Sequence, residues 1–233
     1  MSNAGPRTRV DAILFDLDGT LVDTAPDMVA VLTDLQKDNG REPLSYELAR
    51  SHVSNGALGL VRLAFPDVDD AERDRLHRDY LERYGESVCI ASTLFPGFAE
   101  LLDRFDAHGV PWGVVTNKPA RMTEPLLARL GLDGRLACTV SGDTLPQRKP
   151  HPAPLLHACR MAGVAPERSI YVGDASRDIE AGRAAGMRTI AAAYGYITAD
   201  DDPGAWGADE MAASTEELIR LIHAALGFEP PEF

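Results

Sequence analysis

The stretch from Val10 to Thr20, VDAILFDLDGT, decides the fold of this chain. Four consecutive apolar residues, 12–15, lead into Asp16 and Asp18, and a Gly-Thr pair then interrupts the pattern. A short apolar run that ends at a glycine predicts a buried strand of a parallel sheet. Ligands bind beyond the carboxyl ends of such strands, so Asp16 and Asp18 are expected at the mouth of a site.

Two carboxylates this close on one strand end repel each other unless a cation lies between them or one of them holds a proton. Mg²⁺ fits such a place, because it prefers hard oxygen ligands and often takes only one or two carboxylates together with phosphate oxygens. A strand that ends in a solvated acidic turn explains a lone Asp-x-Asp pattern equally well. The choice between the two therefore depends on the rest of the chain.

Composition narrows the class of protein. The 233 residues are 45% hydrophobic, enough for a sizeable core, as one large domain or a domain with an insertion. Lys and Arg number 23 against 36 Asp and Glu, so the formal net charge is −13. An acidic surface argues against nucleic acid and anionic membranes as partners and leaves a small molecule. An anionic small molecule must then be drawn by a local cluster of cations.

The cysteines and the start of the chain predict a cytoplasmic protein. Cys89, Cys138 and Cys159 are scattered without a Cys-x-x-Cys spacing, which favours reduced thiols. The first nine residues, MSNAGPRTR, lack the apolar segment of a signal peptide, and no apolar run approaches membrane-spanning length. A monomer and a homodimer are both compatible with these features.

Helical patterns alone occupy the stretch after the first strand. The first expected helix begins at Asp23. Three further helices are expected over residues 45–52, 56–65 and 69–83. Because crossovers rarely need four helices, residues 23–87 are interpreted as an inserted all-helical cap domain. Residues 1–22 and 88–233 then form the core domain. An ordinary crossover between two strands is the alternative interpretation.

Strands and helices alternate in the remainder of the chain. The strands are expected over residues 110–115, 137–140, 168–172 and 189–193, and a helical pattern follows each of them. Repeated strand-helix units predict an α/β protein with a doubly wound parallel sheet and right-handed crossovers.

Polar residues stand where these strands end. Thr116 and Asn117 follow the strand at 110–115, and Asp174 follows the strand at 168–172, with Asp178 one helical turn further on. Lys149 lies in a stretch stiffened by prolines, QRKPHP. Since the carboxyl ends of parallel strands share one edge of the sheet, a hydroxyl, a lysine and several carboxylates converge there. Such a series argues against the solvated-turn explanation.

Four motifs now stand in order along the chain: DLDGT (16–20), TN (116–117), KP (149–150) and GDASRD (173–178). This order resembles the haloacid dehalogenase superfamily over nearly the whole chain. A helical cap inserted just after the first motif resembles the phosphoglycolate phosphatase branch. The stretches 112–131 and 194–209 are similar to the N-acetylmuramic acid 6-phosphate phosphatases of peptidoglycan recycling.

The resemblance implies catalysis through an aspartyl-phosphate. Asp16 is the implied nucleophile, and Asp18 is the implied acid, which protonates the leaving alkoxide and later takes a proton from water. Dehalogenases of this fold lack the second acid, because a halide leaves without a proton, so Asp18 favours phosphoryl transfer. Thr116, the Asn117 backbone N–H and Lys149 are implied to hold the other phosphate oxygens.

The resemblance also implies Mg²⁺ as the cofactor, which offsets the repulsion between an anionic nucleophile and an anionic ester. The implied ligand set is Asp16, Asp18 through its backbone carbonyl, Asp174 and Asp178. The role of Asp178 is open: it can reach the metal through water, orient Lys149, or serve only as an acid in the first turn of a helix.

The cap is implied to supply the contacts that select the substrate, and HVSNGALGLVR (52–62) is its best candidate. The turn Ser54-Asn55-Gly56 opens a helix and can present N–H groups to an anion. Arg62 is predicted to pair with a substrate carboxylate. A solvated helix residue is the alternative for Arg62.

Together these features predict a Mg²⁺-dependent phosphomonoester hydrolase that acts on a small anionic phosphate ester. The resemblance places N-acetylmuramic acid 6-phosphate first and 2-phosphoglycolate second. A phosphosugar mutase shares the fold and the aspartyl-phosphate, and release of free phosphate separates the two activities. A non-catalytic protein that binds a phosphorylated ligand is the third alternative, against which the complete set of Asp16, Asp18, Lys149 and Asp174 argues.

Overall fold

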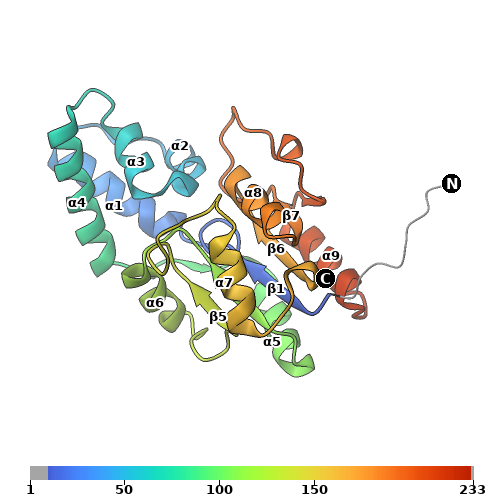
Figure 1. The fold of residues 1–233 in the computed structure, drawn as a ribbon. Helices are drawn as coiled ribbons and strands as arrows, with labels where there is room; N and C mark the ends of the chain where they lie inside the picture. Colours follow the sequence, from blue (N-terminus) through green and yellow to red (C-terminus); the bar gives the residue numbers. More distant parts are fainter. Residues whose placement is uncertain (1–9, 232–233) are drawn as a thin grey trace.

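A computed structural model describes residues 10–231 and contains the parallel sheet that the strand patterns predict (Figure 1). Its six strands lie in the order β5-β4-β1-β6-β7-β8 and pair in parallel throughout. The strands are β1 (Ala12–Phe15), β4 (Trp112–Val115), β5 (Cys138–Val140), β6 (Ser169–Gly173), β7 (Arg188–Ala192) and β8 (Glu210–Ala212). The prediction of a doubly wound α/β fold is confirmed.

The strand β1 is the point at which the sheet changes direction. Leu14 is in register with Gly113 of β4 on one side and with Tyr171 of β6 on the other. The chain adds β4 and β5 outward on the first side, then returns across β1 to add β6, β7 and β8 on the second. A crevice opens at the carboxyl end of a sheet where the winding reverses. Asp16, the residue after β1, therefore stands at the place where ligands bind in such sheets.

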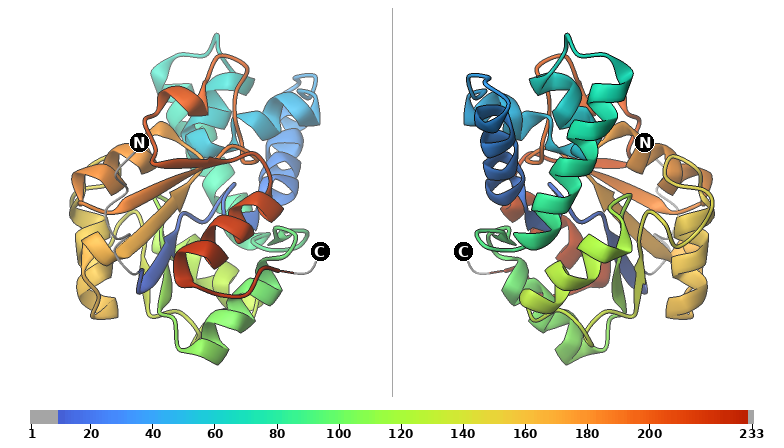
Figure 2. Two further views of the ribbon diagram at one scale, coloured as in Figure 1. Left: turned by 90° about the vertical axis from the view of Figure 1, so that its right-hand side faces the viewer. Right: turned by 90° about the vertical axis from the view of Figure 1, so that its left-hand side faces the viewer.

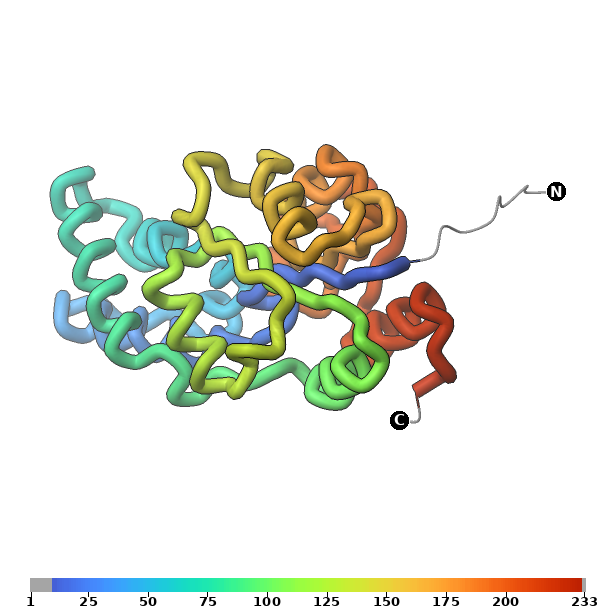
Figure 3. The backbone as a smooth tube through the Cα atoms, turned by 60° about the horizontal axis from the view of Figure 1, so that its bottom comes forward, coloured from blue at the N-terminus to red at the C-terminus, as the bar shows by residue number. Residues whose placement is uncertain are grey.

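Alternate residues of β1 pack on opposite faces of the sheet, as the two-residue period of a strand requires. Phe15 lies against Phe98 and Phe105, with ring centroids 5.6 and 6.5 Å away. The helices on that face are α5 (Phe98–His108), α6 (Ala120–Arg129) and α9 (Thr215–Leu226). Leu14 faces the other side, covered by α7 (Ala153–Ala162) and α8 (Ser176–Ala184). Figure 3 shows β1 running between these two layers.

A block of helices stands apart from the sheet and beyond its carboxyl edge (Figure 1). It consists of α1 (Ala25–Asp38), α2 (Tyr46–Ser51), the 3₁₀ turn η1 (Val53–Asn55), α3 (Gly56–Ala64) and α4 (Asp70–Glu86). The helices α1 and α4 lie side by side (Figure 2). Tyr80 of α4 is fully buried and donates a hydrogen bond of 2.9 Å to the carbonyl of Met28 in α1. The predicted helices are thus present, while their standing as a separate domain over 23–87 stays a prediction.

The block is joined to the sheet through a narrow two-stranded ribbon. β2 (Val22–Asp23) leads into α1, β3 (Thr93–Leu94) leads out after α4, and the two pair antiparallel. The buried carboxylate of Asp27 accepts hydrogen bonds of 2.8–3.0 Å from the N–H groups of Ile90, Ala91 and Ser92. The incoming helix and the outgoing linker are therefore tied together at the base of the block.

Two features bear on the predicted environment of the protein. Cys89, Cys138 and Cys159 are all free thiols, and burial raises the pKa of Cys138 to about 12, which keeps that thiol protonated. Within residues 10–231, no helix combines the length and the apolar character needed to cross a membrane.

Candidate active site

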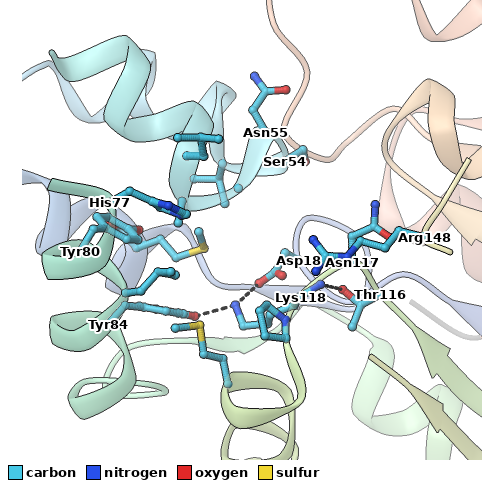
Figure 4. A pocket seen from close by; sticks show the side chains of 18 of the residues that line it. Asp18, Ser54, Asn55, His77, Tyr80, Tyr84, Thr116, Asn117, Lys118 and Arg148 are labelled. Carbon is cyan, nitrogen blue, oxygen red and sulfur yellow. Dashed lines mark hydrogen bonds and ion pairs between the residues drawn. The ribbon is translucent and has the colours of Figure 1, made fainter. Parts of the chain in front are cut away.

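A cavity of about 570 Å³ separates the carboxyl edge of the sheet from the helical block (Figure 4). We call its sheet side the floor; it is lined by Asp16, Asp18, Thr116, Asn117, Lys118, Arg148 and Arg177. We call its helical side the roof; it is lined by Met28, Val53, Ser54, Asn55, Gly56, Ala57, Leu58, His77, Tyr80, Leu81 and Tyr84. Pro119 and Met122 complete the lining next to the floor. The floor is almost entirely polar, and most of the roof is apolar or aromatic.

Asp16 is held rigidly at the end of β1. Its Oδ1 accepts hydrogen bonds from the Leu17 N–H at 2.7 Å and from the Lys149 ammonium at 2.9 Å. Both bonds fall on one oxygen, which leaves Oδ2 without a partner among residues 10–231. Only 4% of Asp16 is exposed. A carboxylate fixed through one oxygen and open at the other suits attack on an electrophile.

The Lys149 ammonium is bound by several buried polar groups. Its ammonium lies 2.7 Å from Asp178 Oδ1 and donates to the Val115 carbonyl at 2.9 Å and to the Tyr171 hydroxyl at 2.8 Å. Burial raises the pKa of Asp178 and the ammonium opposes that rise. Lys149 and Asp178 thus form a buried ion pair, in addition to the bond from Lys149 to Asp16.

Asp178 also caps the first turn of α8, where its Oδ2 accepts a hydrogen bond from the N–H of Ala175 at 3.1 Å. The structure therefore places Asp178 both beside Lys149 and at a helix start, two of the three roles left open by the sequence. It also belongs to an acidic cluster, described next.

Asp16, Asp174 and Asp178 form a buried acidic cluster in which one carboxylate oxygen of each lies within 4.8 Å of the others. Burial, together with the charges of Asp16 and Asp178, raises the pKa of Asp174 to about 7. Buried carboxylates this close are unfavourable without a compensating cation, and hard oxygen ligands are what Mg²⁺ prefers. The donor set therefore fits the metal that the sequence predicts.

Gly19 makes room for this cluster. Its φ of +79° is in the left-handed region, and a Cβ at this position would collide with the Asp174 carboxylate. The glycine of the DLDGT motif is thus required both by backbone conformation and by the close approach of the chain to Asp174.

The Asp18 side chain lies outside the acidic cluster and points toward the roof. Its Oδ1 accepts hydrogen bonds from the Thr24 hydroxyl at 2.6 Å and from the Lys118 ammonium at 2.9 Å. This side chain therefore offers no carboxylate oxygen to the cluster, and a contribution of Asp18 to the metal falls to its backbone carbonyl. Both of these hydrogen bonds fall on Oδ1 of the Asp18 carboxyl group.

Lys118 is a functional residue that the sequence reasoning missed. Its ammonium donates to Asp18 and, at 2.9 Å, to the hydroxyl of Tyr84 in α4, and it lies 4.5 Å from the centre of the Tyr84 ring. Burial opposes the charge, but Asp18 and Tyr84 outweigh burial and raise the pKa of Lys118. The signal was its position directly after Thr116 and Asn117, at the end of β4.

Thr116 and Asn117 are brought to the floor as expected. The Asn117 side chain makes two hydrogen bonds with the backbone of Lys149, accepting its N–H at 3.1 Å and donating to its carbonyl at 3.0 Å. The Thr116 hydroxyl accepts the N–H of Lys118 at 3.1 Å. The end of β4 therefore positions Lys118 on the floor and Lys149 behind it.

The turn Ser54-Asn55-Gly56 lines the roof, but its main contact differs from the predicted one. The Ser54 hydroxyl donates to Asp174 Oδ2 at 2.6 Å, and Arg177 of α8 donates to the Ser54 carbonyl at 2.8 Å. This turn is thus attached to the acidic cluster. Arg62 is exposed on α3 and is not among the residues that line the cavity, so its predicted pairing with a substrate carboxylate stays a prediction.

Tyr196 is a second residue that sequence reasoning missed, although it lies in the stretch 194–209. Its backbone N–H donates to Asp174 Oδ2 at 2.9 Å. Its hydroxyl accepts the N–H groups of Thr24 and Ala25 at 2.7 and 2.9 Å and donates to Asp23 at 2.7 Å. One side chain therefore joins the acidic cluster to the start of α1, where Thr24 binds Asp18.

Fold and site together define an α/β enzyme with a buried aspartate, a lysine and a buried acidic cluster at the switch point of its sheet. Residues 13–192 match the sequence profile of the haloacid dehalogenase-like hydrolases. An N-acetylmuramic acid 6-phosphate phosphatase from Pseudomonas aeruginosa is 42% identical over 221 residues, which cover 94% of this chain and 98% of that protein. A phosphoglycolate phosphatase from Xanthomonas campestris pv. campestris is also 42% identical, over 207 residues that cover 89% and 94%. The chain belongs to the haloacid dehalogenase-like hydrolase family and is a phosphatase.

A solved structure agrees with this assignment. The crystal structure of a predicted phosphoglycolate phosphatase from Haemophilus somnus 129pt has a TM-score of 0.81 at 30% identity and covers 93% of this chain and 100% of its own. The resemblance read from the four motifs is thereby confirmed.

Proposed function

We propose that this phosphatase hydrolyses N-acetylmuramic acid 6-phosphate, in preference to 2-phosphoglycolate, through an aspartyl-phosphate on Asp16. The observation that supports this substrate is the cavity of about 570 Å³ with its mostly apolar and aromatic roof, which offers more space and more apolar surface than a two-carbon acid phosphate can use. The three free cysteines fit the reducing cytoplasm in which we propose the enzyme works.

In the proposed reaction, Asp16 Oδ2 attacks phosphorus and the bond to the ester oxygen breaks. In this step Asp18 acts as the general acid and gives a proton to the leaving alkoxide. A water molecule then attacks the aspartyl-phosphate and gives its proton to Asp18, which releases phosphate and restores both carboxyl groups. The separation of Asp18 from the acidic cluster supports this role, because among residues 10–231 its carboxyl group is bound only by Thr24 and Lys118.

The acidic cluster is proposed to hold Mg²⁺, which when bound neutralises charge on the transferring phosphoryl group. Asp16, Asp174 and Asp178 supply its side-chain oxygens, and Asp18 its backbone carbonyl. Thr116 and the Asn117 N–H are proposed to bind the phosphoryl oxygens from the floor. Lys149 keeps Asp16 oriented through its 2.9 Å contact with Asp16 Oδ1.

The roof supports a sugar rather than a small acid. Met28, Val53, Leu58, Tyr80 and Leu81 give the cavity an apolar wall opposite Asp16. A pyranose ring has apolar C–H faces and an N-acetyl group has a methyl, both of which gain by leaving water against such a wall. 2-Phosphoglycolate offers no comparable surface and would leave most of a cavity of about 570 Å³ unfilled.

The test is phosphate release with Mg²⁺, comparing kcat/KM on the two esters. A preference of about 100-fold for the sugar phosphate, about 3 kcal/mol in the transition state, is expected. Asp16→Asn serves as the blank and Asp34→Asn, an exposed carboxylate on α1, as the matched control that keeps full activity. A reverse preference contradicts the proposed substrate. Isomerised sugar phosphate in place of free phosphate indicates a mutase, and binding without turnover indicates a non-catalytic binder.

A further inference from the structure

We propose that Arg148 binds the carboxylate of the substrate. This inference rests on the proposed function, since it assigns the floor residue that distinguishes a phosphate ester bearing a carboxylate from one without it. It is an alternative to the role predicted for Arg62, which is not among the residues that line the cavity.

The backbone that carries Arg148 is fixed from both sides. The next residue, Lys149, is buried, and its backbone is bound by the Asn117 side chain. The carbonyl of Arg148 accepts the N–H of His151 at 2.9 Å. Figure 4 shows Arg148 beside Asn117 and across the cavity from His77, Tyr80 and Tyr84. A long side chain on so constrained a backbone reaches a defined part of the cavity.

The cationic side chains of the floor differ in the protein groups that already bind them. Lys118 is bound to Asp18, and Arg177 donates to the Ser54 carbonyl and lies among the charges of the acidic cluster. Arg148 lines the cavity with an exposed side chain, and no described residue forms a hydrogen bond or an ion pair with it. In a chain of net charge −13, this leaves the Arg148 guanidinium available for an anion that enters the cavity.

The chemistry of the substrate supplies such an anion. A guanidinium binds a carboxylate through two parallel N–H···O bonds, a geometry that an ammonium does not reproduce. The phosphate of the substrate must lie against Asp16, next to Lys149, so a carboxylate elsewhere on the same molecule remains to be paired. Arg148 is adjacent to Lys149 in sequence, and its guanidinium has no partner among residues 10–231, so it is placed to pair with this carboxylate.

The experiment compares N-acetylmuramic acid 6-phosphate with N-acetylglucosamine 6-phosphate, which has the same sugar and phosphate but lacks the lactyl carboxylate. For Arg148→Ala we expect kcat/KM on the first ester to fall about 30-fold, mainly through KM. The second ester should change by less than about threefold, because it loses no ion pair. Arg148→Lys should recover only part of the loss. Arg62→Ala, an exposed arginine outside the cavity, is the matched control and should change neither value.

An equal loss on both esters overturns the proposal, since it shows attraction of the phosphate alone, and so does no loss on either. Binding of each ester to Asp16→Asn, with and without Arg148→Ala, gives the same comparison where turnover is slow. If the wild type prefers 2-phosphoglycolate, the proposed substrate fails separately. Arg148 is then tested on 2-phosphoglycolate against ethyl phosphate, and a loss confined to the first keeps the carboxylate assignment.

Discussion

The floor and the roof of the cavity are built on different principles. On and directly behind the floor, Asp16, Lys149 and Asp178 are almost completely buried, and each is bonded to at least one of the others at 2.7–2.9 Å. On the roof, Tyr80 and Tyr84 stack with ring centroids 6.2 Å apart, and the surface they offer is largely nonpolar. The floor therefore determines which reaction is possible, and the roof determines which molecule is held over it.

The two regions are not independent, because hydrogen bonds connect them. Lys118 on the floor binds Tyr84, Arg177 on the floor donates to the Ser54 carbonyl, and the Ser54 hydroxyl on the roof donates to Asp174 behind the floor. A change confined to the floor should reduce turnover of every ester alike, whereas a change confined to the roof should alter the preference among esters. Substitutions at the contacts that join floor and roof therefore test whether turnover and preference among esters are determined separately.

The largest effect is expected from Lys118→Met, which keeps the length of the side chain but removes the ammonium from Asp18. Without that bond the carboxyl group is no longer held toward the leaving oxygen, so kcat should fall about 100-fold on every ester, with little change in KM. Steady-state kinetics on a sugar phosphate and a small acid phosphate measure both values.

Tyr84→Phe is the matched control for that change, because it keeps the ring beside Lys118 and removes only the hydroxyl. A much smaller loss is expected. If Tyr84→Phe slows turnover as much as Lys118→Met does, the roof takes part in the chemistry and the division between floor and roof is wrong.

A pH-dependent effect of about tenfold per unit is expected for Mg²⁺ binding. The pKa of Asp174 is raised to about 7 in the metal-free protein, so below that pH a proton competes with the metal. The stability of the metal-free protein depends on pH in the opposite direction to the Mg²⁺ affinity. A raised carboxyl pKa stabilises the metal-free folded state at low pH, and that contribution is lost as pH rises through about 7.

The apparent affinity for Mg²⁺ should therefore weaken below pH 7, and Mg²⁺ should raise Tm more at pH 8 than at pH 6. Thermal unfolding at several Mg²⁺ concentrations measures both trends. Asp174→Asn should flatten them, and an unchanged pH dependence in that variant would assign the proton to another group.

The smallest effect is expected from Ser54→Ala, which removes the roof hydroxyl from Asp174. A hydrogen bond to a carboxylate stabilises its charged form, so Mg²⁺ affinity should fall about 3- to 10-fold. Ser51→Ala, whose hydroxyl binds only the Leu48 carbonyl and the adjacent His52 ring, is the control in a thermal titration with Mg²⁺. An affinity as high as that of the control would show that the roof does not contribute to the metal site.

The floor could be predicted from sequence because its residues follow strands. Apolar runs lead to Asp16, Thr116 and Asp174. This pattern alone predicts that the three residues lie at one edge of a parallel sheet. Lys118 was missed although it lies two residues beyond Thr116, because its partner Tyr84 is 34 residues away and no local spacing connects them.

The roof could be predicted only as helices. Periodicity shows that residues 56–64 form a helix, but which face of that helix meets the cavity depends on packing against α1 and α4. Arg62 therefore looked suitable and lies on the solvent side. The short strand β8 was also missed, because three residues are too few to show an alternating pattern.

The ribbon of β2 and β3 gives the molecule a modular construction. The chain enters the helical block through β2 and leaves it through β3, and these two strands pair with each other, so the segment between them starts and ends at the same place beside the sheet. The pairing of β1 with β4 does not depend on how long that excursion is or how it is folded. Selection can therefore exchange one roof for another while the same catalytic floor is kept.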